Sequence, residues 1–243
     1  MLRVINCNVY PKCLSLSSYF VLTLVSDLQL RRSESACAYD DKECLGQSTQ
    51  IFLERTCLGI PAYDIKPIDP LVIPSLTYHA QSVKLTLKNL TITGLKHQII
   101  NDFKMDIQKK SVILATSAQL NIVANLDATF TATVFFSTFH VKDMLETAFY
   151  NYNFITNKKG LEHFDVGPET LTCKLLGTPD FSIEFNQALD DIVEPTWQQY
   201  LEAKDNFAQD LLCDIISTAY RDVVHNIRAA AKILPKTAFF NNI

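Results

Sequence analysis

Apolar and polar side chains alternate along the middle of the chain. From Val112 to Val134 the even-numbered positions are almost all apolar, and the odd-numbered positions are mostly Ser, Thr, Gln, Asn and Asp. Successive side chains of a strand point to opposite faces, so this pattern predicts long or consecutive strands with one apolar face. Shorter alternating runs at Val83–Leu87 and Phe103–Ile107 add further strands, and a phase slip at Asn89 predicts a bulge. A sheet with one apolar face has to wrap another element.

A second apolar pattern, with steps of three and four residues, fills the C-terminal third. It runs from Trp197 to Ala230, and no glycine or proline interrupts residues 196–234. Such a stripe predicts one helix of up to about 38 residues, about 55 Å long. Pro195 favours its start and Pro235 its end. A long helix on a curved one-sided sheet leaves space near the sheet ends, where an apolar ligand fits.

A short amphipathic helix is predicted from Lys42 to Leu58. Phe52, Leu53 and Leu58 lie near one face, and Gly59 ends the helix. Because it is short, its stability must come from docking. Two roles fit such a helix, a lid docked by one face or a plain packing helix, and the pattern alone favours the second.

The segment Gly59–Pro74 holds four of the nine prolines of the chain. Proline fixes φ, removes a backbone donor and restricts the residue before it. The segment therefore cannot be a helix or a central strand. We expect a stiff extended connector between the first helix and the strands.

Composition narrows the class of protein. The 243 residues carry a net charge of −4 and no cluster of Lys or Arg, which argues against nucleic acid and against an anionic membrane surface. Nearly half of the residues are apolar, as in ordinary globular proteins. Six glycines are too few for an enzyme built on a glycine-rich loop. No segment approaches transmembrane length, so we expect no stable membrane insertion.

The N-terminus has the pattern of an export signal. Arg3 and Lys12 precede the apolar run Leu14–Val25, which matches the core of a signal peptide and is too short to span a bilayer. We interpret residues 1–26 as a signal peptide and residues 27–243 as a single secreted domain. The alternative, a first core helix, is weakened by the serines within the run.

Export changes the interpretation of the cysteines. Five of the seven remain after the signal peptide, and an oxidising compartment favours two disulfides and one odd cysteine. Cys37 and Cys44 enclose a short polar loop and form a natural local bridge, and Cys173 and Cys213 then pair at long range. Cys57 is expected as a buried thiol. No CxxC-like spacing is present, so no metal site is expected.

Several long and unusual strings carry a family resemblance. They are Cys37-x6-Cys44, FLERTCLGIPAYDIKPIDPLVIPSL, LKNLTITGLKHQIINDFKMD, the Tyr150-Asn-Tyr152-Asn step, HFDVGPETLTC up to Cys173, and VVHNIRAAAKILPKTAFFNN. Through them the chain resembles the haemolymph juvenile-hormone-binding proteins of moths, within the wider takeout-like family of insect carriers. The resemblance extends from about Cys37 to the last residues.

The resemblance implies an α+β fold, in which a highly curved antiparallel sheet, related to tubular lipid-binding folds, wraps a long C-terminal helix. It implies the same two disulfides and a short N-terminal helix that closes over the pocket as a gate. It also implies a secreted, monomeric haemolymph carrier without a cofactor. The ligand would be juvenile hormone, a sesquiterpenoid ester with an epoxide at one end. A takeout-like carrier of another apolar ligand, such as an odorant or lipid, is the alternative.

The resemblance also implies binding residues. The Tyr150 hydroxyl is expected to donate a hydrogen bond to the epoxide oxygen, which accepts but cannot donate. Tyr152 shares the strand face of Tyr150, and Phe164 on the following strand is a candidate wall residue. For Tyr152 and Phe164, a plain role as core aromatics is an equal alternative.

The sequence argues against an enzyme. The five histidines lie in no GxSxG, HExxH or Cys–His context, and no paired carboxylates stand in an apolar setting. His225 is predicted to point to solvent, and His163 to lie opposite the pocket face. A hydrolase acting on the hormone ester is therefore disfavoured. Asn89 begins the one glycosylation sequon, and its place in a predicted strand argues against occupancy.

Overall fold

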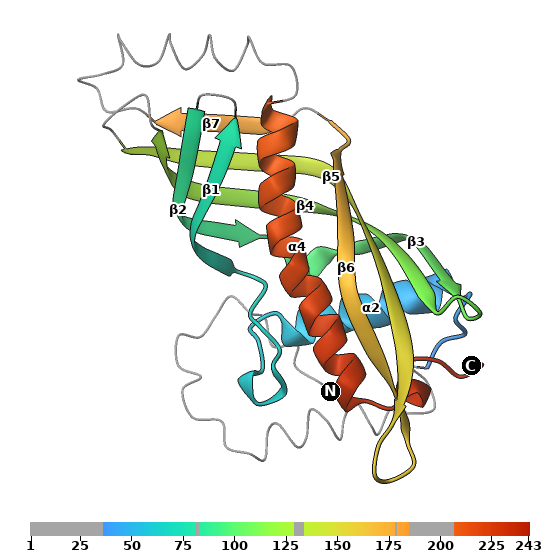
Figure 1. The fold of residues 1–243 in the computed structure, drawn as a ribbon. Coiled ribbons are helices and arrows are strands. Elements are labelled where there is room, and N and C mark those ends of the chain that lie inside the picture. Colours follow the sequence, from blue (N-terminus) through green and yellow to red (C-terminus); the bar gives the residue numbers. More distant parts are fainter. Residues whose placement is uncertain (1–35, 81–82, 129–133, 178, 185–206) are drawn as a thin grey trace, which may run out of the picture.

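The computed structural model describes residues 36–80, 83–128, 134–177, 179–184 and 207–243. The interpreted signal peptide, residues 1–26, and the expected beginning of the C-terminal helix, residues 196–206, lie outside the described residues. Within them, an antiparallel sheet curls around a long helix, with a shorter helix across one end (Figure 1). This is the α+β architecture that the sequence predicts.

The described helices are α2 (Lys42–Thr56) and α4 (Phe207–Ile233), with 3-10 turns η1 (Pro61–Tyr63), η2 (Leu95–His97) and η3 (Lys236–Ala238). The described strands are β1 (Leu71–Ala80), β2 (Val83–Thr93), β3 (Ile99–Asp106), β4 (Ser111–Ala128), β5 (Val134–Thr156), β6 (Glu162–Leu175) and β7 (Asp180–Glu184).

β4 and β5 form the spine of the sheet, and each changes its outer partner half-way along. The first half of β4 pairs with β3 and its second half with β2. The first half of β5 pairs with β7 and its second half with β6. The change coincides with a register irregularity between Ala118 and Leu120. In Figure 1, β1, β2 and β7 accompany the first half of α4, whereas β3 and α2 lie towards its second half.

A glycine permits the close approach of β2 to this irregularity. Gly94 has a φ of +105°, and a Cβ there would lie 2.1 Å from the carbonyl oxygen of Gln119. The buried carboxylate of Asp69 accepts hydrogen bonds from the backbone N–H groups of Gly94, at 3.0 Å, and Lys96, at 3.1 Å. The chain can therefore turn tightly against β4 only because this residue has no side chain. The predicted bulge at Asn89 is also present, as a register shift between Lys88 and Thr91.

Helix α2 confirms the predicted short helix but not all of its apolar face. Leu53 is fully buried, whereas Leu58 is 62% exposed, so its predicted place on the docked face is wrong. The helix ends at Thr56 and Gly59 then adopts a φ of +79°, which carries Leu58 off the helical face. Thr56 and Cys57 are buried in its place.

The proline-rich segment is less extended than predicted. Pro61–Tyr63 forms a 3-10 turn, closed by the backbone pairing of Ile60 with Ile65. The exclusion of a central strand is correct, since β1, which contains Pro74, lies at one end of the strand order of the described sheet.

Helix α4 holds this segment through a buried amide. Asn226 is fully buried and makes two hydrogen bonds of 2.8 Å to the backbone of Lys66, one to its N–H and one to its C=O. The ammonium of Lys66 pairs with Asp222 at 2.6 Å. His225, which was predicted to point to solvent, is partly exposed, and its Nε2 lies 2.8 Å from the backbone oxygen of Asp64. These contacts fix the proline-rich segment against α4.

Two disulfides anchor the ends of the helices. Cys37–Cys44 fixes the start of α2, with Cα atoms 5.7 Å apart. Cys173–Cys213 joins β6 to α4, with Cα atoms 5.4 Å apart. Cys57 is a buried thiol. No described helix has both the length and the apolar character needed to cross a membrane.

Around the first half of α4, the described apolar residues form a closely packed core. Its members come from β2, β4 and α4 and are at most 2% exposed: Leu85, Leu87, Leu90, Ile92, Leu120, Ile122, Leu211, Leu212, Ile215, Ile216 and Ala219. Around the second half of α4 the same layers of structure enclose a cavity.

Candidate functional site

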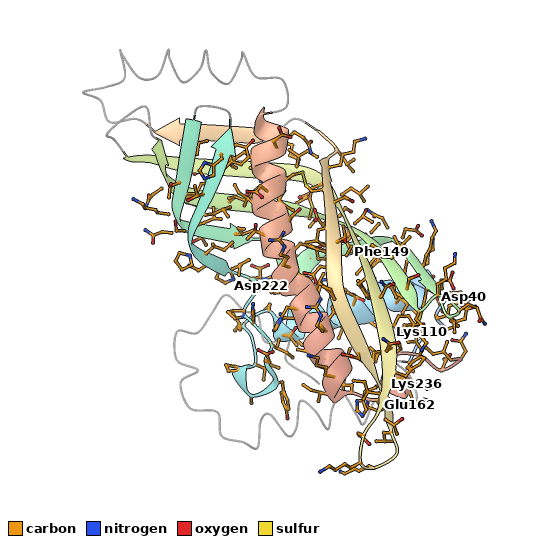
Figure 2. The ribbon with its side chains drawn as sticks, viewed as in Figure 1. Asp40, Lys110, Phe149, Glu162, Asp222 and Lys236 are labelled. Carbon is orange, nitrogen blue, oxygen red and sulfur yellow. A yellow bond between two sulfur atoms is a disulfide. The ribbon has the colours of Figure 1, made fainter. Side chains whose placement is uncertain are left out.

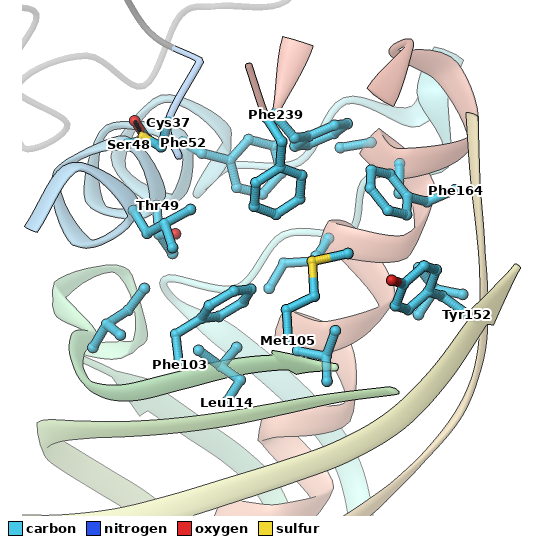
Figure 3. Close-up of a pocket in the computed structure, with 18 of the residues that line it drawn as sticks. Cys37, Ser48, Thr49, Phe52, Phe103, Met105, Leu114, Tyr152, Phe164 and Phe239 are labelled. Atoms are coloured by element: carbon cyan, nitrogen blue, oxygen red, sulfur yellow. Dashed lines mark hydrogen bonds between the residues drawn. The ribbon is translucent and has the colours of Figure 1, made fainter. Parts of the chain in front are cut away.

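A cavity of about 180 Å³ lies between α2, the second half of α4 and the sheet formed by β3, β4, β5 and β6 (Figure 3). Its sheet side follows from the period of two, since inward positions of each strand line it. These positions are Ile100, Phe103 and Met105 on β3, Val112 and Leu114 on β4, Tyr150 and Tyr152 on β5, and Phe164 and Val166 on β6. All three residues that the sequence analysis named, Tyr150, Tyr152 and Phe164, therefore lie in the cavity wall.

The two tyrosines bring phenol groups into an apolar environment. Tyr150 is 7% exposed and Tyr152 is 2% exposed. Burial raises the pKa of both hydroxyls, so both stay protonated and can donate a hydrogen bond. The Tyr152 hydroxyl is buried without a hydrogen-bond partner among the described residues. Figure 3 shows this oxygen turned into the cavity, towards Met105. A buried phenol oxygen without a partner is costly, which points to a ligand oxygen as its partner.

Phe164 is the centre of an aromatic cluster. Its ring centroid lies 5.3 Å from that of Tyr152, and 6.0 Å and 5.7 Å from those of Phe239 and Phe240. Phe239 and Phe240 line the cavity and belong to the C-terminal tail. Sequence analysis missed them; their only signal is a pair of large aromatics in a polar tail beyond the end of the helix.

The helix α2 closes the opposite side. It contributes apolar Leu45 and Phe52 and the hydroxyl-bearing Ser48 and Thr49. The Ser48 hydroxyl lies 3.5 Å from the sulfur of Cys37. The helix that the pattern alone favoured as a plain packing element therefore forms a wall of the cavity.

The two ends of the described domain meet over this wall. The backbone N–H of Cys37 donates to the carbonyl of Phe239 at 3.0 Å, and the N–H of Asn241 donates to the carbonyl of Cys37 at 3.1 Å. The turn η3 is tied to β6 by an ion pair of 2.5 Å between Lys236 and Glu162 (Figure 2). The start of α2 and the C-terminal tail thus hold each other over the cavity.

An arginine on α4 shapes β6 where this strand enters the cavity wall. The Arg228 guanidinium donates to the carbonyls of Val166, at 3.1 Å, and Gly167, at 2.9 Å, and it pairs with Glu169. The register of β5 with β6 shifts at this level, between Tyr150 and Tyr152. A bidentate guanidinium on strand carbonyls fixes that irregularity and, with it, the direction of the tyrosines.

The other candidates lie away from the cavity. His163 is buried and its Nε2 lies 2.8 Å from the amide nitrogen of Asn157, and it does not line the cavity. Asn89 is exposed at the β2 irregularity, with a φ of +53°, so its side chain is accessible despite the strand. Across the described ranges, no group of three or more His, Cys, Asp or Glu side chains is arranged to hold a metal ion.

Comparisons with known proteins agree with this geometry. A family model described as haemolymph juvenile hormone binding protein matches residues 18–231. A juvenile hormone-binding protein of Manduca sexta is 41% identical over 219 residues, which cover 85% of this chain and 95% of that protein. The crystal structure of Takeout 1 of Epiphyas postvittana superposes with a TM-score of 0.69 at 17% identity, covering 85% of this chain and 99% of that one. The fold is therefore takeout-like.

Proposed function

The chain belongs to the haemolymph juvenile hormone binding protein family, and we propose that it is a secreted haemolymph carrier of juvenile hormone, bound in the cavity under α2. One observation carries the proposal within that family. The cavity is apolar except for phenol hydroxyls on its β5 wall and hydroxyls on its α2 wall. A chain-like apolar ligand with a polar group at each end matches this arrangement of an apolar middle between two polar walls.

In the proposed complex, Tyr150 and Tyr152 face the epoxide. An epoxide oxygen accepts hydrogen bonds and cannot donate, so protonated phenols complement it. The hydrocarbon body packs on Phe103, Met105 and Leu114. The ester end then lies towards the hydroxyl-bearing side of α2.

Apolar burial supplies most of the affinity. A ligand of about 20 non-hydrogen atoms at roughly 0.3–0.5 kcal/mol per atom gives about −6 to −10 kcal/mol. This range corresponds to dissociation constants from tens of micromolar to tens of nanomolar. Hydrogen bonds from the phenols orient the ligand rather than hold it.

Helix α2 is the proposed gate of this cavity. It forms one wall, it is anchored at its start by Cys37–Cys44, and it ends in the left-handed turn of Gly59. Movement at these two points exposes the cavity and leaves the sheet unchanged. The proline-rich segment beyond Gly59 stays fixed on α4 through Asn226.

The proposal treats the protein as a carrier and not as a hydrolase of the hormone ester. The cavity-lining residues among those described include no His, Asp or Glu, which are the usual general bases. Incubation of the secreted protein with hormone and analysis of the products tests this point. We expect the ester to be recovered intact.

Equilibrium binding with labelled juvenile hormone tests the main proposal, with unlabelled fatty acids and odorants as competitors. We expect saturable one-site binding that unlabelled hormone displaces and the other ligands displace far less. Full displacement by fatty acids at comparable concentration would instead identify a general carrier of apolar ligands. Absence of hormone binding would refute the proposal.

A further inference from the structure

A polar layer, buried except for Ser217 at its edge, lies between α4 and the sheet. The hydroxyls of Thr116 and Tyr220 lie 2.7 Å apart, and the Ser217 hydroxyl donates to a carboxylate oxygen of Glu146 at 2.9 Å. Thr116 is 1% exposed, and Glu146 and Tyr220 are fully buried. Tyr220 is among the largest fully buried side chains of the described residues.

This layer stands directly beyond one end of the cavity. On β4, Val112 and Leu114 line the cavity, and Thr116 is the next inward position. On β5, Tyr150 lines it, and Glu146 lies four residues before it on the same face. On α4, Ile227 lines it, and Tyr220 precedes Ile227 by two turns, about 10 Å along the axis.

Beyond the layer, the described core residues are closely packed. The residues that follow along the same elements, Leu120 on β4 and Ile216 on α4, are fully buried. Among the described residues, the polar layer thus separates the cavity from a closely packed part of the core.

We propose that Thr116, Glu146, Ser217 and Tyr220 form a floor that limits the length of the ligand. The proposal rests on the proposed function, since it concerns the ligand of the same cavity. Two properties make the layer a barrier to a hydrocarbon chain. The Tyr220 ring fills the space, and its hydroxyl and that of Thr116 satisfy each other. A chain that entered would separate these partners and bury them without hydrogen bonds.

The carboxyl group strengthens the barrier. One oxygen of Glu146 accepts from Ser217, while the other has no partner among the described residues. An apolar chain placed against that oxygen offers it no hydrogen bond, so contact with Glu146 adds nothing to the affinity of a longer ligand. The floor therefore selects a ligand that ends near Tyr150 and Leu114.

Removal of the floor tests this inference. The test variant Thr116→Val/Tyr220→Leu replaces both hydroxyl partners by apolar groups and shortens the large side chain, so that no orphaned hydroxyl is left. Tyr220→Ala removes more volume and serves as a second variant. Tyr220→Phe keeps the ring and removes only its hydroxyl, and Leu87→Ala weakens the packed core beyond the layer; both serve as comparison variants.

The probes are methyl esters of unbranched saturated acids, lengthened by two carbons at each step, with binding measured at equilibrium. In the wild type we expect affinity to rise with length, by about fourfold per buried methylene, and then to fall at a limit. In the test variants we expect the limit to move by at least one step, so that the first ester rejected by the wild type gains about tenfold or more. Leu87→Ala should keep the wild-type limit, and Tyr220→Phe, which loses the hydroxyl pair but keeps the ring, should move the limit less than the test variants do.

The outcomes separate the floor from the function. If the wild type binds the shorter esters and hormone, but the folded test variants show the wild-type limit, the floor is wrong and the carrier proposal stands. If the limit also moves in Leu87→Ala, general loosening of the core explains it and the floor is again wrong. If the wild type binds neither the esters nor hormone, the carrier proposal fails and the floor fails with it.

Discussion

Two phenols on one face of β5 dominate the chemistry of the cavity at the scale of single residues. Tyr150 and Tyr152 are separated by one residue and by the β5–β6 irregularity, and both reach the cavity. The sequence analysis placed the hydrogen bond on Tyr150 through a family resemblance. It had no means of distinguishing the two tyrosines, because both occupy the same face by the period of two.

Substitution of each tyrosine separates their roles. We expect Tyr150→Phe to weaken hormone binding by about 1–2 kcal/mol and to leave the fold intact, because it removes one hydrogen bond and no packing. Tyr152→Phe should also weaken binding, while the ligand-free protein gains stability because a buried hydroxyl without a partner is removed. Affinity is measured with labelled hormone and stability by denaturant unfolding. Unchanged affinity in Tyr150→Phe would remove Tyr150 from the ligand site.

Glu146 gives the fold a dependence on pH. Burial raises the pKa of this carboxyl to about 7, against the lowering effects of the Ser217 hydrogen bond and of Arg221. The folded state holds the proton more tightly than the unfolded state does. The contribution of Glu146 to the free energy of unfolding is therefore fully present below its usual pKa, 4.5, and is lost as pH rises through about 7. Glu146→Gln should remove this loss and stabilise the protein at pH 8 by about 2 kcal/mol.

The measurement is the free energy of unfolding of wild type and Glu146→Gln between pH 5 and pH 8. The two curves should converge at the acidic end, where the wild-type carboxyl is protonated. Ser217→Ala is a useful control, since it removes the donor to Glu146 and should leave the direction of the pH dependence unchanged. A constant difference between wild type and Glu146→Gln across this range would show that Glu146 does not titrate there.

At the scale of secondary-structure elements, the sequence predicted what depends on periodicity. The alternation located the long central strands, the phase slip at Asn89 located a bulge, and the apolar stripe located α4. The error lies at an element end, where Leu58 leaves the helical face because α2 ends early. The sequence also did not predict the contact of His225 with Asp64, because these residues are distant in sequence.

Gly94 shows how closely two of these elements approach. A methyl group at this position would clash with the Gln119 carbonyl, and the residue that carries it would have to keep a positive φ, which is unfavourable for any residue with a side chain. We expect Gly94→Ala to lower the free energy of unfolding by about 3 kcal/mol. Gly160 is a matched control with a φ of +75° and no atom within 4 Å of the position of a Cβ. Gly160→Ala should lower the free energy of unfolding by about 1 kcal/mol, the cost of a positive φ in a residue with a side chain. Equal losses in the two variants, measured by urea unfolding, would contradict the steric argument.

The two disulfides should separate gating from global stability. Cys37–Cys44 closes a short loop at the start of α2, so its replacement by Cys37→Ser/Cys44→Ser should loosen the proposed gate and speed hormone release. Cys173–Cys213 closes a longer loop, and its replacement by serines should lower global stability by about 4 kcal/mol. Release is followed by chasing bound labelled hormone with excess unlabelled hormone. If the Cys37/Cys44 variant releases hormone at the wild-type rate, the gate does not depend on this anchor.

For the whole molecule, the sequence predicted the wrapping of a long helix by a one-sided sheet but not the part that the C-terminal tail takes in closing the cavity. Closure depends on Phe239 and Phe240 meeting Phe164, and on the pairing of Cys37 with the C-terminal tail. These contacts join the two ends of the described domain, and no local pattern encodes them. The exchange of partners along β4 and β5 is likewise non-local, because alternation defines the faces of a strand and not its neighbours.

Ligand binding at one site in this closed fold should stabilise the whole domain. A ligand that binds only the folded state at 100 times its dissociation constant adds about 2.7 kcal/mol. For a domain of this size, that gain raises the melting temperature by about 5–10 °C. Hormone added to wild type in a thermal scan should produce this shift. Ala230→Phe fills the cavity from α4, where Ala230 forms part of its wall, and should melt at one temperature with or without hormone. An equal shift in this variant would place the hormone outside the cavity.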